Sequence, residues 1–207
     1  MGLISNGTTL LDAGSIDSGV AKGALTHIKT LTASSSSTLS FVDGASGVVL
    51  DNTYKEYIFK FYNIHPDGNN RFQFNGSSNT GSSYDVSKTT TVFVGQHSET
   101  NAETGDIAYQ NGDDLHNGTG FQDLMAYGNQ DSDNDHSLNG TLHLYDPSNT
   151  TFATHFMANS QGNIDTNYSV NTHIGGYFNT TSAIDAIQFK MNSGNVDSGT
   201  IKLYGVS

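Results

Sequence analysis

The chain has 207 residues, with 20 Asp and Glu against 8 Lys and Arg, and a formal net charge of −12. A surface this acidic repels phosphate backbones, which argues against nucleic-acid binding through a basic patch. No apolar run approaches the roughly 18 residues that a membrane-spanning helix needs, so no membrane span is expected. Cysteine is absent, which excludes disulfides and thiolate metal sites.

The composition lies near the border between folded and disordered chains. Gly, Ser, Thr and Asn make up 91 of the 207 residues, whereas Leu, Ile, Val and Phe make up 45, just above the roughly 20% below which highly charged chains are usually disordered. The 11 Phe and 10 Tyr favour a folded chain, because aromatic side chains bury large areas and are common in strands. We expect one all-β domain over residues 25–207, preceded by an N-terminal arm at 1–24.

The charge is unevenly distributed along the chain. Residues 89–189 contain 12 acidic and no basic residues, whereas the remainder holds 8 of each and is neutral. We therefore expect one outward-facing acidic region, with docking surfaces drawn from the neutral parts. That acidic region would include Glu99, Glu103, Asp106, Asp113 and Asp131. Two interpretations stay open, a solvated acidic face and a cation-binding surface.

The first segment in chain order, residues 1–23, is rich in glycine and has scattered apolar residues. Two interpretations fit it, an arm that packs on a neighbouring copy and a frayed terminus. In the first, the interface candidates are Leu3, Ile4, Leu10 and Leu11. The segment has neither a basic n-region nor an apolar h-region, so no secretory signal is expected.

Strand patterns dominate the next part of the chain. Residues 25–32 and 38–42 predict two strands, and residues 56–64 form a dense run of aromatic and β-branched side chains. Period-2 alternation puts Tyr57, Phe59 and Phe61 on one face and Ile58, Lys60, Tyr62 and Ile64 on the other. Apolar residues on both faces are typical of a central strand or of one covered by a partner. A turn around Pro66 and a half-buried strand at 71–74 should follow.

Further strands are predicted at 84–94, 140–145, 151–157, 168–177, 184–191 and 200–206. Turn clusters separate them, a pattern typical of an antiparallel β-sandwich of the jelly-roll type. The turn at Asp146-Pro147-Ser148-Asn149 joins two of these strands. We expect it to place Leu142 and Leu144 on a shared face near Phe152 and Phe156.

One long polar segment, residues 96–136, interrupts this alternation of predicted strands and turns. Loops longer than about 12–15 residues are usually functional or partly structured. Within the segment, residues 120–127 predict a short helix that places Leu124 and Tyr127 on the face of Phe121.

Three alternating carboxylates in this segment, Asp131, Asp133 and Asp135, are the candidate metal ligands. Alternate carboxylates in a tight loop suit Ca²⁺, which takes six to eight oxygen ligands. The EF-hand pattern then needs Gly at the sixth position and Glu at the twelfth, where this chain has His136 and Leu142. A calcium loop of another type and a solvated acidic turn both stay open, and no other cofactor is expected.

The remaining chemistry-bearing residues form no catalytic motif. The chain lacks a GxSxG elbow, a Walker A sequence, a dinucleotide fingerprint and an HExxH pair. Scattered surface positions are therefore expected for the histidines of the acidic segment, which are His97, His116, His136, His143, His155 and His173. Tyrosines that could form a sugar-stacking platform, or be half-buried in strands, are Tyr84, Tyr109, Tyr145 and Tyr168.

Three stretches together resemble a known group of proteins. They are Lys60-Phe61-Tyr62-Asn63-Ile64-His65-Pro66, the run Gly140 to Pro147, and the stretch from Ala183 through Gly205. In these residues the chain is similar to small virion structural proteins of tailed bacteriophages, especially those of marine hosts, over roughly residues 25–207. The resemblance implies a β-sandwich particle component and transfers no catalytic residues.

The functional expectation follows from this resemblance. It is a non-enzymatic virion subunit, either a capsid decoration or a tail or fibre protein, that is made in the host cytoplasm. Its partners would be copies of itself and other virion proteins, bound through neutral surfaces and the N-terminal arm. One alternative is a carbohydrate-binding module that recognises a host surface glycan through loop 96–136. A polysaccharide-degrading enzyme is a third hypothesis, since sequence alone favours no pair of catalytic carboxylates.

Overall fold

The computed structural model describes residues 3–5, 7–12, 15–16, 23–100 and 105–207, and this part of the chain contains strands and no helix. An eight-stranded and a four-stranded sheet, both antiparallel, pack face to face. The prediction of an antiparallel β-sandwich is confirmed. The jelly-roll form of that sandwich stays a prediction.

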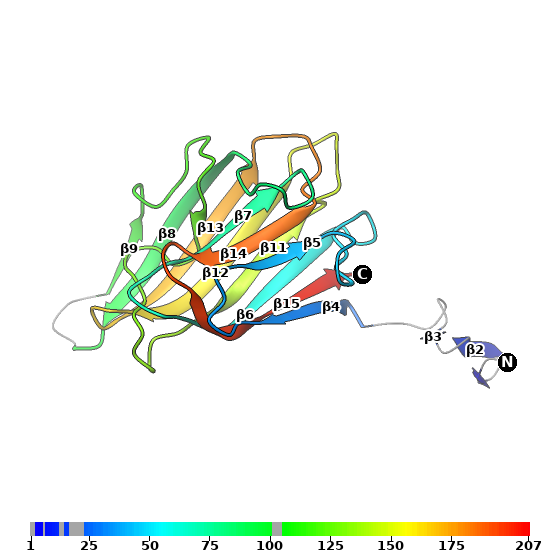
Figure 1. Ribbon diagram of the computed structural model, residues 1–207, viewed down its shortest axis with the longest axis horizontal. Helices are drawn as coiled ribbons and strands as arrows, with labels where there is room; N and C mark the ends of the chain where they lie inside the picture. The colour runs from blue at the N-terminus through cyan, green and yellow to red at the C-terminus, as the bar shows by residue number, and fades with distance from the viewer. Residues whose placement is uncertain (1–2, 6, 13–14, 17–22, 101–104) are drawn as a thin grey trace.

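The larger sheet runs from strand β4 at one edge to β9 at the other (Figure 1). Its strands in spatial order are β4 (Leu25–Thr32), β15 (Val196–Val206), β6 (Glu56–Pro66), β11 (Leu138–Tyr145), β12 (His155–Ile164), β13 (Tyr168–Phe178), β8 (Lys88–Ser98) and β9 (Asp106–Tyr109). A central strand was one of the two interpretations of residues 56–64, and β6 does lie between β15 and β11; cover by a partner stays a prediction.

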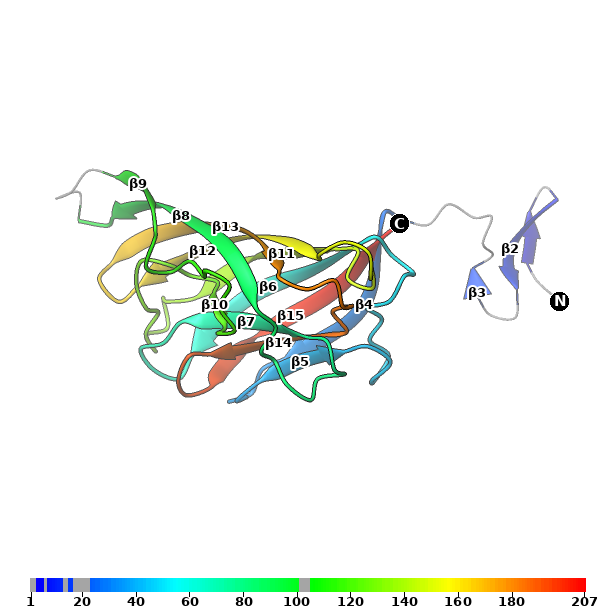
Figure 2. The same cartoon turned by 90° about the horizontal axis from the view of Figure 1, so that it is seen from above.

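The smaller sheet lies against one face of the larger one, as the turned view in Figure 2 shows. Its strands in spatial order are β10 (Gln122–Asp123), β7 (Phe72–Ser77), β14 (Ala186–Met191) and β5 (Leu39–Val42). We call the face of the eight-stranded sheet that points away from this smaller sheet the outer face.

The N-terminal segment forms a small sheet of its own. Strands β1 (Leu3–Ser5), β2 (Thr8–Asp12) and β3 (Ser15–Ile16) pair with one another and with no strand of the sandwich. Ile4 on β1 is 62% exposed, and both figures draw this sheet apart from the sandwich. Contact of the arm with a neighbouring copy stays a prediction.

Aromatic rings fill the space between the two sheets. The ring of Phe189 on β14 lies 5.3 Å from those of Phe59 and Phe61 and 5.7 Å from that of Phe72. All four side chains are at most 1% exposed. Edge-to-face and tilted aromatic pairs of this kind add to the free energy that apolar burial contributes.

The alternation predicted for β6 holds until a bulge near its end. Tyr57, Phe59 and Phe61 are buried, as expected, but Ile64 is buried too, although it was expected on the face of Lys60. The register with β11 shifts in this region, and Asn63 has a φ of 48°. The extra residue of the bulge returns Ile64 to the core face, which period-2 counting does not foresee.

The hairpin after Leu144 is confirmed in part. Leu142 and Leu144 are buried, and Leu144 lies opposite Phe156 across β11 and β12. The prediction that Phe152 shares their face was wrong, since Phe152 is 71% exposed. Strand β12 begins only at His155, so Phe152 belongs to the turn, where its backbone N–H is held by the Asn149 side chain.

The predicted helix at 120–127 was also wrong. Gln122 and Asp123 instead form β10 and pair with Phe74 and Gln73 at the edge of β7, and the Leu124 N–H donates to the Phe72 carbonyl. The exposed edge of β7 offers a hydrogen-bond ladder that competes with local helix formation. The three residues that follow β10 are buried against the core, namely Leu124, Met125 and Ala126.

Candidate binding surfaces

Side chains on the outer face line up in continuous rows across the strands, because directly paired residues point to the same side of a sheet. One row, read from β15 to β9, contains Lys202, Lys60, Thr141, Asn159, His173, Phe93 and Tyr109. The next row contains Tyr204, Ile58, His143, Met157, Gly175 and Thr91. The outer face is therefore rich in aromatic, imidazole and apolar groups.

Exposed large apolar side chains concentrate on this sheet. Of the ten in the described residues, seven lie on its strands, namely Leu25, Tyr62, Phe93, Ile107, Tyr109, Met157 and Tyr177. Met157 is 58% exposed and Phe93 45%. Two adjoining hollows of about 300 and 250 Å³ share Met157 and His173 as lining residues. Contiguous exposed apolar surface of this kind usually marks an interaction site.

Polar groups on the outer face mostly satisfy one another. The ring of His173 stacks on that of Phe93 at 4.9 Å between centroids. The Asn159 side-chain amide lies 2.9 Å from His173 Nδ1, and His143 Nδ1 lies 2.6 Å from Glu56 Oε1. Beside these internally bonded polar groups, Met157 and Phe93 are the exposed large apolar side chains of the two rows' central part.

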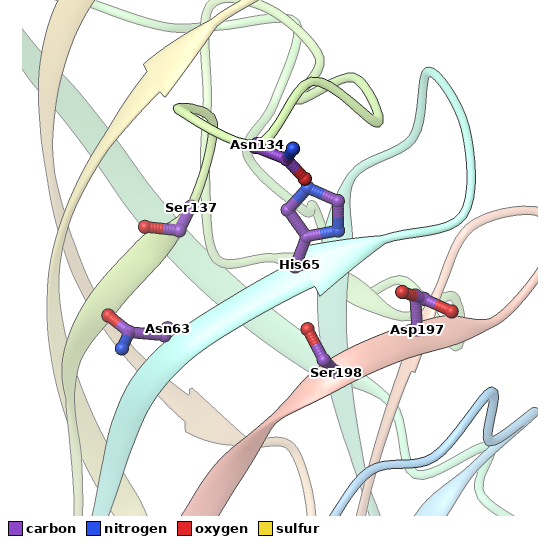
Figure 3. Close-up of a pocket in the computed structure, with 6 residues that line it drawn as sticks. All are labelled: Asn63, His65, Asn134, Ser137, Asp197 and Ser198. Atoms are coloured by element: carbon purple, nitrogen blue, oxygen red, sulfur yellow. The ribbon is translucent and has the colours of Figure 1, made fainter.

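A second candidate surface is a polar hollow of about 360 Å³ beside the bulged ends of β6 and β15 (Figure 3). Its lining side chains are Asn63, His65, Asn134, Ser137, Asp197 and Ser198. The bulge at Asn63 and the φ of 122° at Gly199 turn neighbouring strand residues toward the hollow. Amide, hydroxyl, imidazole and carboxylate groups in one hollow suit a ligand with many hydroxyl groups.

The acidic loop that carries the candidate calcium ligands borders this hollow. Asp131 Oδ1 accepts a hydrogen bond from the Asp133 N–H and lies 2.6 Å from His136 Nδ1. Asp135 is 82% exposed. Within the described residues no group of three or more His, Asp or Glu side chains is placed to hold a metal ion. The structure thus pairs Asp131 with a histidine instead of joining it to Asp133 and Asp135.

His136 itself corrects one expectation. It was grouped with the surface histidines, yet it is 4% exposed, because the loop turns back through the bond from the His136 N–H to the Asp133 carbonyl. The other histidines of the acidic segment are half-buried or exposed, namely His97, His116, His143, His155 and His173. Sequence spacing contains no signal for this turn, since Asp131 and His136 are polar residues in a polar stretch.

The candidate tyrosines do not form one platform. Tyr109 and Tyr145 lie on strands of the eight-stranded sheet, and Tyr109, 56% exposed, donates its hydroxyl hydrogen bond to Asp114. Tyr84 and Tyr168 are half-buried. Of the two alternatives for these tyrosines, a sugar-stacking platform and a half-buried position in a strand, Tyr145 and Tyr168 adopt the second.

Only some of the acidic side chains of residues 89–189 face outward, whereas this was expected of the whole region. Glu99, Asp106 and Asp135 are exposed, and Glu103 lies outside the described residues. Asp113, expected outward, has a side chain only 11% exposed and pairs with Arg71 Nη1 at 2.5 Å. Arg71 also bonds Asp123 at 3.1 Å and Asn129 at 2.9 Å. This arginine fixes the second half of segment 96–136 against β7.

The fully buried Lys88 anchors the same segment from β8. Its ammonium donates to Asn75 Oδ1 at 2.8 Å and to the Gly120 carbonyl at 2.6 Å. Burial lowers the pKa of Lys88 to about 7. Likewise, burial raises the pKa of Asp123. The anchoring roles of Arg71 and Lys88 have no signal in the sequence, because their partners are distant in the chain.

Comparison of the chain with protein-family models, with curated proteins and with solved structures finds no match. Among the described residues, no helix has the length and apolar character to cross a membrane.

Proposed function

We propose that the protein is a non-enzymatic structural subunit of a tailed-bacteriophage virion, a capsid decoration or a tail or fibre subunit. It assembles with copies of itself and with other virion proteins. The observation that carries this proposal is the small N-terminal sheet, which pairs with no strand of the sandwich and exposes Ile4. A segment with strand structure of its own and an exposed apolar side chain is suited to docking on a neighbour.

Two further features support the proposal. The resemblance of residues 60–66 and 140–147 to virion proteins lies in the paired strands β6 and β11 and their turns, so it concerns the scaffold. Two buried groups with perturbed pKa values, Lys88 and Asp123, hold the segment 110–130 against the sandwich. Perturbed groups often mark catalytic sites, whereas the contacts of these two groups anchor a segment of the chain.

Mass photometry and negative-stain electron microscopy of the full chain test this proposal. We expect discrete oligomers or ordered assemblies at micromolar concentration. A strict monomer over the whole accessible concentration range would contradict self-assembly.

A second candidate function, recognition of a host glycan, is favoured by the polar hollow of Figure 3. A glycan array with the full chain, with and without calcium, tests it. Asn134→Leu should abolish any signal. Asn52→Leu, a change of the same kind in the exposed turn before β6, at the opposite end of that strand from the hollow, should leave the signal unchanged. No signal with the wild-type chain would end this second candidate.

A further inference from the structure

The charge of the outer face differs from that of the whole chain. Strand pairing places Lys60, Lys202 and Glu56 on it as ionised groups, and the exposed Asp197 of β15 lies at its end beside the polar hollow, so the face is nearly neutral. The chain as a whole carries −12. Two identical copies therefore repel each other least when they approach through this face.

The size of the outer face matches what a stable pair of proteins needs. Seven of its eight strands have at least eight residues. The seven strands are separated by about 4.8 Å each and rise about 3.3 Å per residue, so the part of the sheet that is seven strands wide and eight residues long covers about 750 Å². Specific interfaces bury about 800 Å² on each partner.

The chemistry of the face suits a protein partner better than a sugar. A sugar site presents polar groups that converge on the ligand's hydroxyls, whereas here Asn159 and His143 already bond His173 and Glu56. What they leave free is the apolar surface of Phe93 and Met157. Aromatic residues and Met are enriched, and charged residues depleted, at the centres of protein interfaces.

From these observations we infer that the outer face of the eight-stranded sheet pairs with the same face of a second copy of this chain. The inference rests on the proposed function, because it names the surface through which the self-assembling subunit associates. Strands β11 and β12 are the two central strands of the sheet, so Met157 on β12 lies midway between the two edges of the sheet.

Paired substitutions test this inference by sedimentation-velocity ultracentrifugation of the full chain. Met157→Lys adds a charge on an exposed side chain midway between the edges of the sheet, and we expect it to weaken self-association about tenfold or more, equivalent to about 1.4 kcal/mol. The matched control is Phe152→Lys, an exposed apolar site in the turn outside the sheet, which should leave association unchanged. Unchanged far-ultraviolet circular dichroism shows that each variant is folded.

Crosslinking provides a second readout, because the chain has no native cysteine. Met157→Cys treated with a bismaleimide should give covalent dimers, and Phe152→Cys should stay monomeric on a denaturing gel. Equal yields from the two variants would overturn the assigned face.

The outcomes separate this inference from the proposed function. A wild-type oligomer that Met157→Lys leaves intact would overturn the face and leave self-assembly standing. A wild-type monomer would overturn both self-pairing and self-assembly. A monomer that binds immobilised agarose or alginate, and loses that binding in Met157→Lys, would make the face a glycan site and overturn the inference.

Discussion

The ammonium of Lys88 donates a hydrogen bond to the side-chain oxygen of Asn75 across the two sheets, at a point where neither residue is exposed to solvent. The Asn75 amide in turn donates to the carbonyls of Tyr84 and Thr119. A cation with no carboxylate partner in the described part of the chain thus joins β8, β7 and the segment before β10. Burial of this ammonium disfavours its charged form.

The first prediction concerns the pH dependence of stability. Unfolded Lys88 keeps its proton up to about pH 10.5, whereas the pKa of the folded group is about 7. Between these values the unfolded state binds more protons, so the free energy of unfolding should rise with pH from about 7 to about 10. Lys88→Met should flatten this rise. Urea denaturation at a series of pH values measures it.

The control for that experiment is Lys55→Met, since the Lys55 side chain is 76% exposed. It should retain the pH dependence of the wild-type chain. A wild-type free energy of unfolding that falls between pH 7 and 9 would contradict the prediction.

The second prediction concerns Arg71. Arg71→Met leaves Asp113 and Asp123 close together, partly buried and without their cation. We expect a loss of at least about 2 kcal/mol in the free energy of unfolding, because a mostly buried carboxylate without its partner is costly. The exposed Lys55–Asp146 pair serves as comparison, and Lys55→Met should cost at most about 1 kcal/mol.

Hydrogen exchange gives the local readout of Arg71→Met. Amide protection should fall in residues 110–130 before it falls in β12 and β13, because Arg71 bonds this segment directly. Uniform loss of protection over the whole sandwich would argue against a local anchoring role.

The third prediction concerns Phe189, whose ring contacts rings from both sheets. Phe189→Ala should lower the free energy of unfolding by about 3–5 kcal/mol, because it removes buried area and leaves a cavity. Phe152→Ala removes the same side chain from an exposed turn and should change stability by no more than about 0.5 kcal/mol. Guanidinium denaturation compares the two, and equal losses would refute the assigned core.

The fourth prediction concerns the N-terminal arm. Combined replacement of Leu3, Ile4, Leu10 and Leu11 by Ser should weaken assembly while the melting temperature of the sandwich stays unchanged, since β1 to β3 pair only with one another. Mass photometry follows assembly, and differential scanning calorimetry follows melting. A lower melting temperature would show that the arm packs on its own sandwich.

Several features of the fold were predictable because they depend on neighbours in sequence. The period-2 spacing of the aromatic residues Tyr57, Phe59 and Phe61 gives the core face of β6, and the Asp146 turn gives the hairpin of β11 and β12. The helix at 120–127 was wrong because the edge of β7, which pairs with Gln122 and Asp123, is invisible in the local pattern.

The candidate surfaces were less accessible to prediction. Asn63, Ser137 and Asp197 meet in one hollow although more than 50 residues separate each from the next along the chain. The acidic loop at Asp131 was recognised, but its partner His136 was placed on the surface, since nothing in the spacing shows how the loop turns back.

The sequence by itself determined an acidic, cysteine-free, all-β chain and most of its strands, because composition and period-2 alternation are local properties. Only the tertiary structure decided which residues meet. Strand register brings Met157 beside His173 and His173 beside Phe93, and the cations Lys88 and Arg71 hold the long polar segment to β7. Although the chain carries a net charge of −12, its outer face is nearly neutral. The sequence could not locate that face, because it is formed by pairing strands from distant parts of the chain.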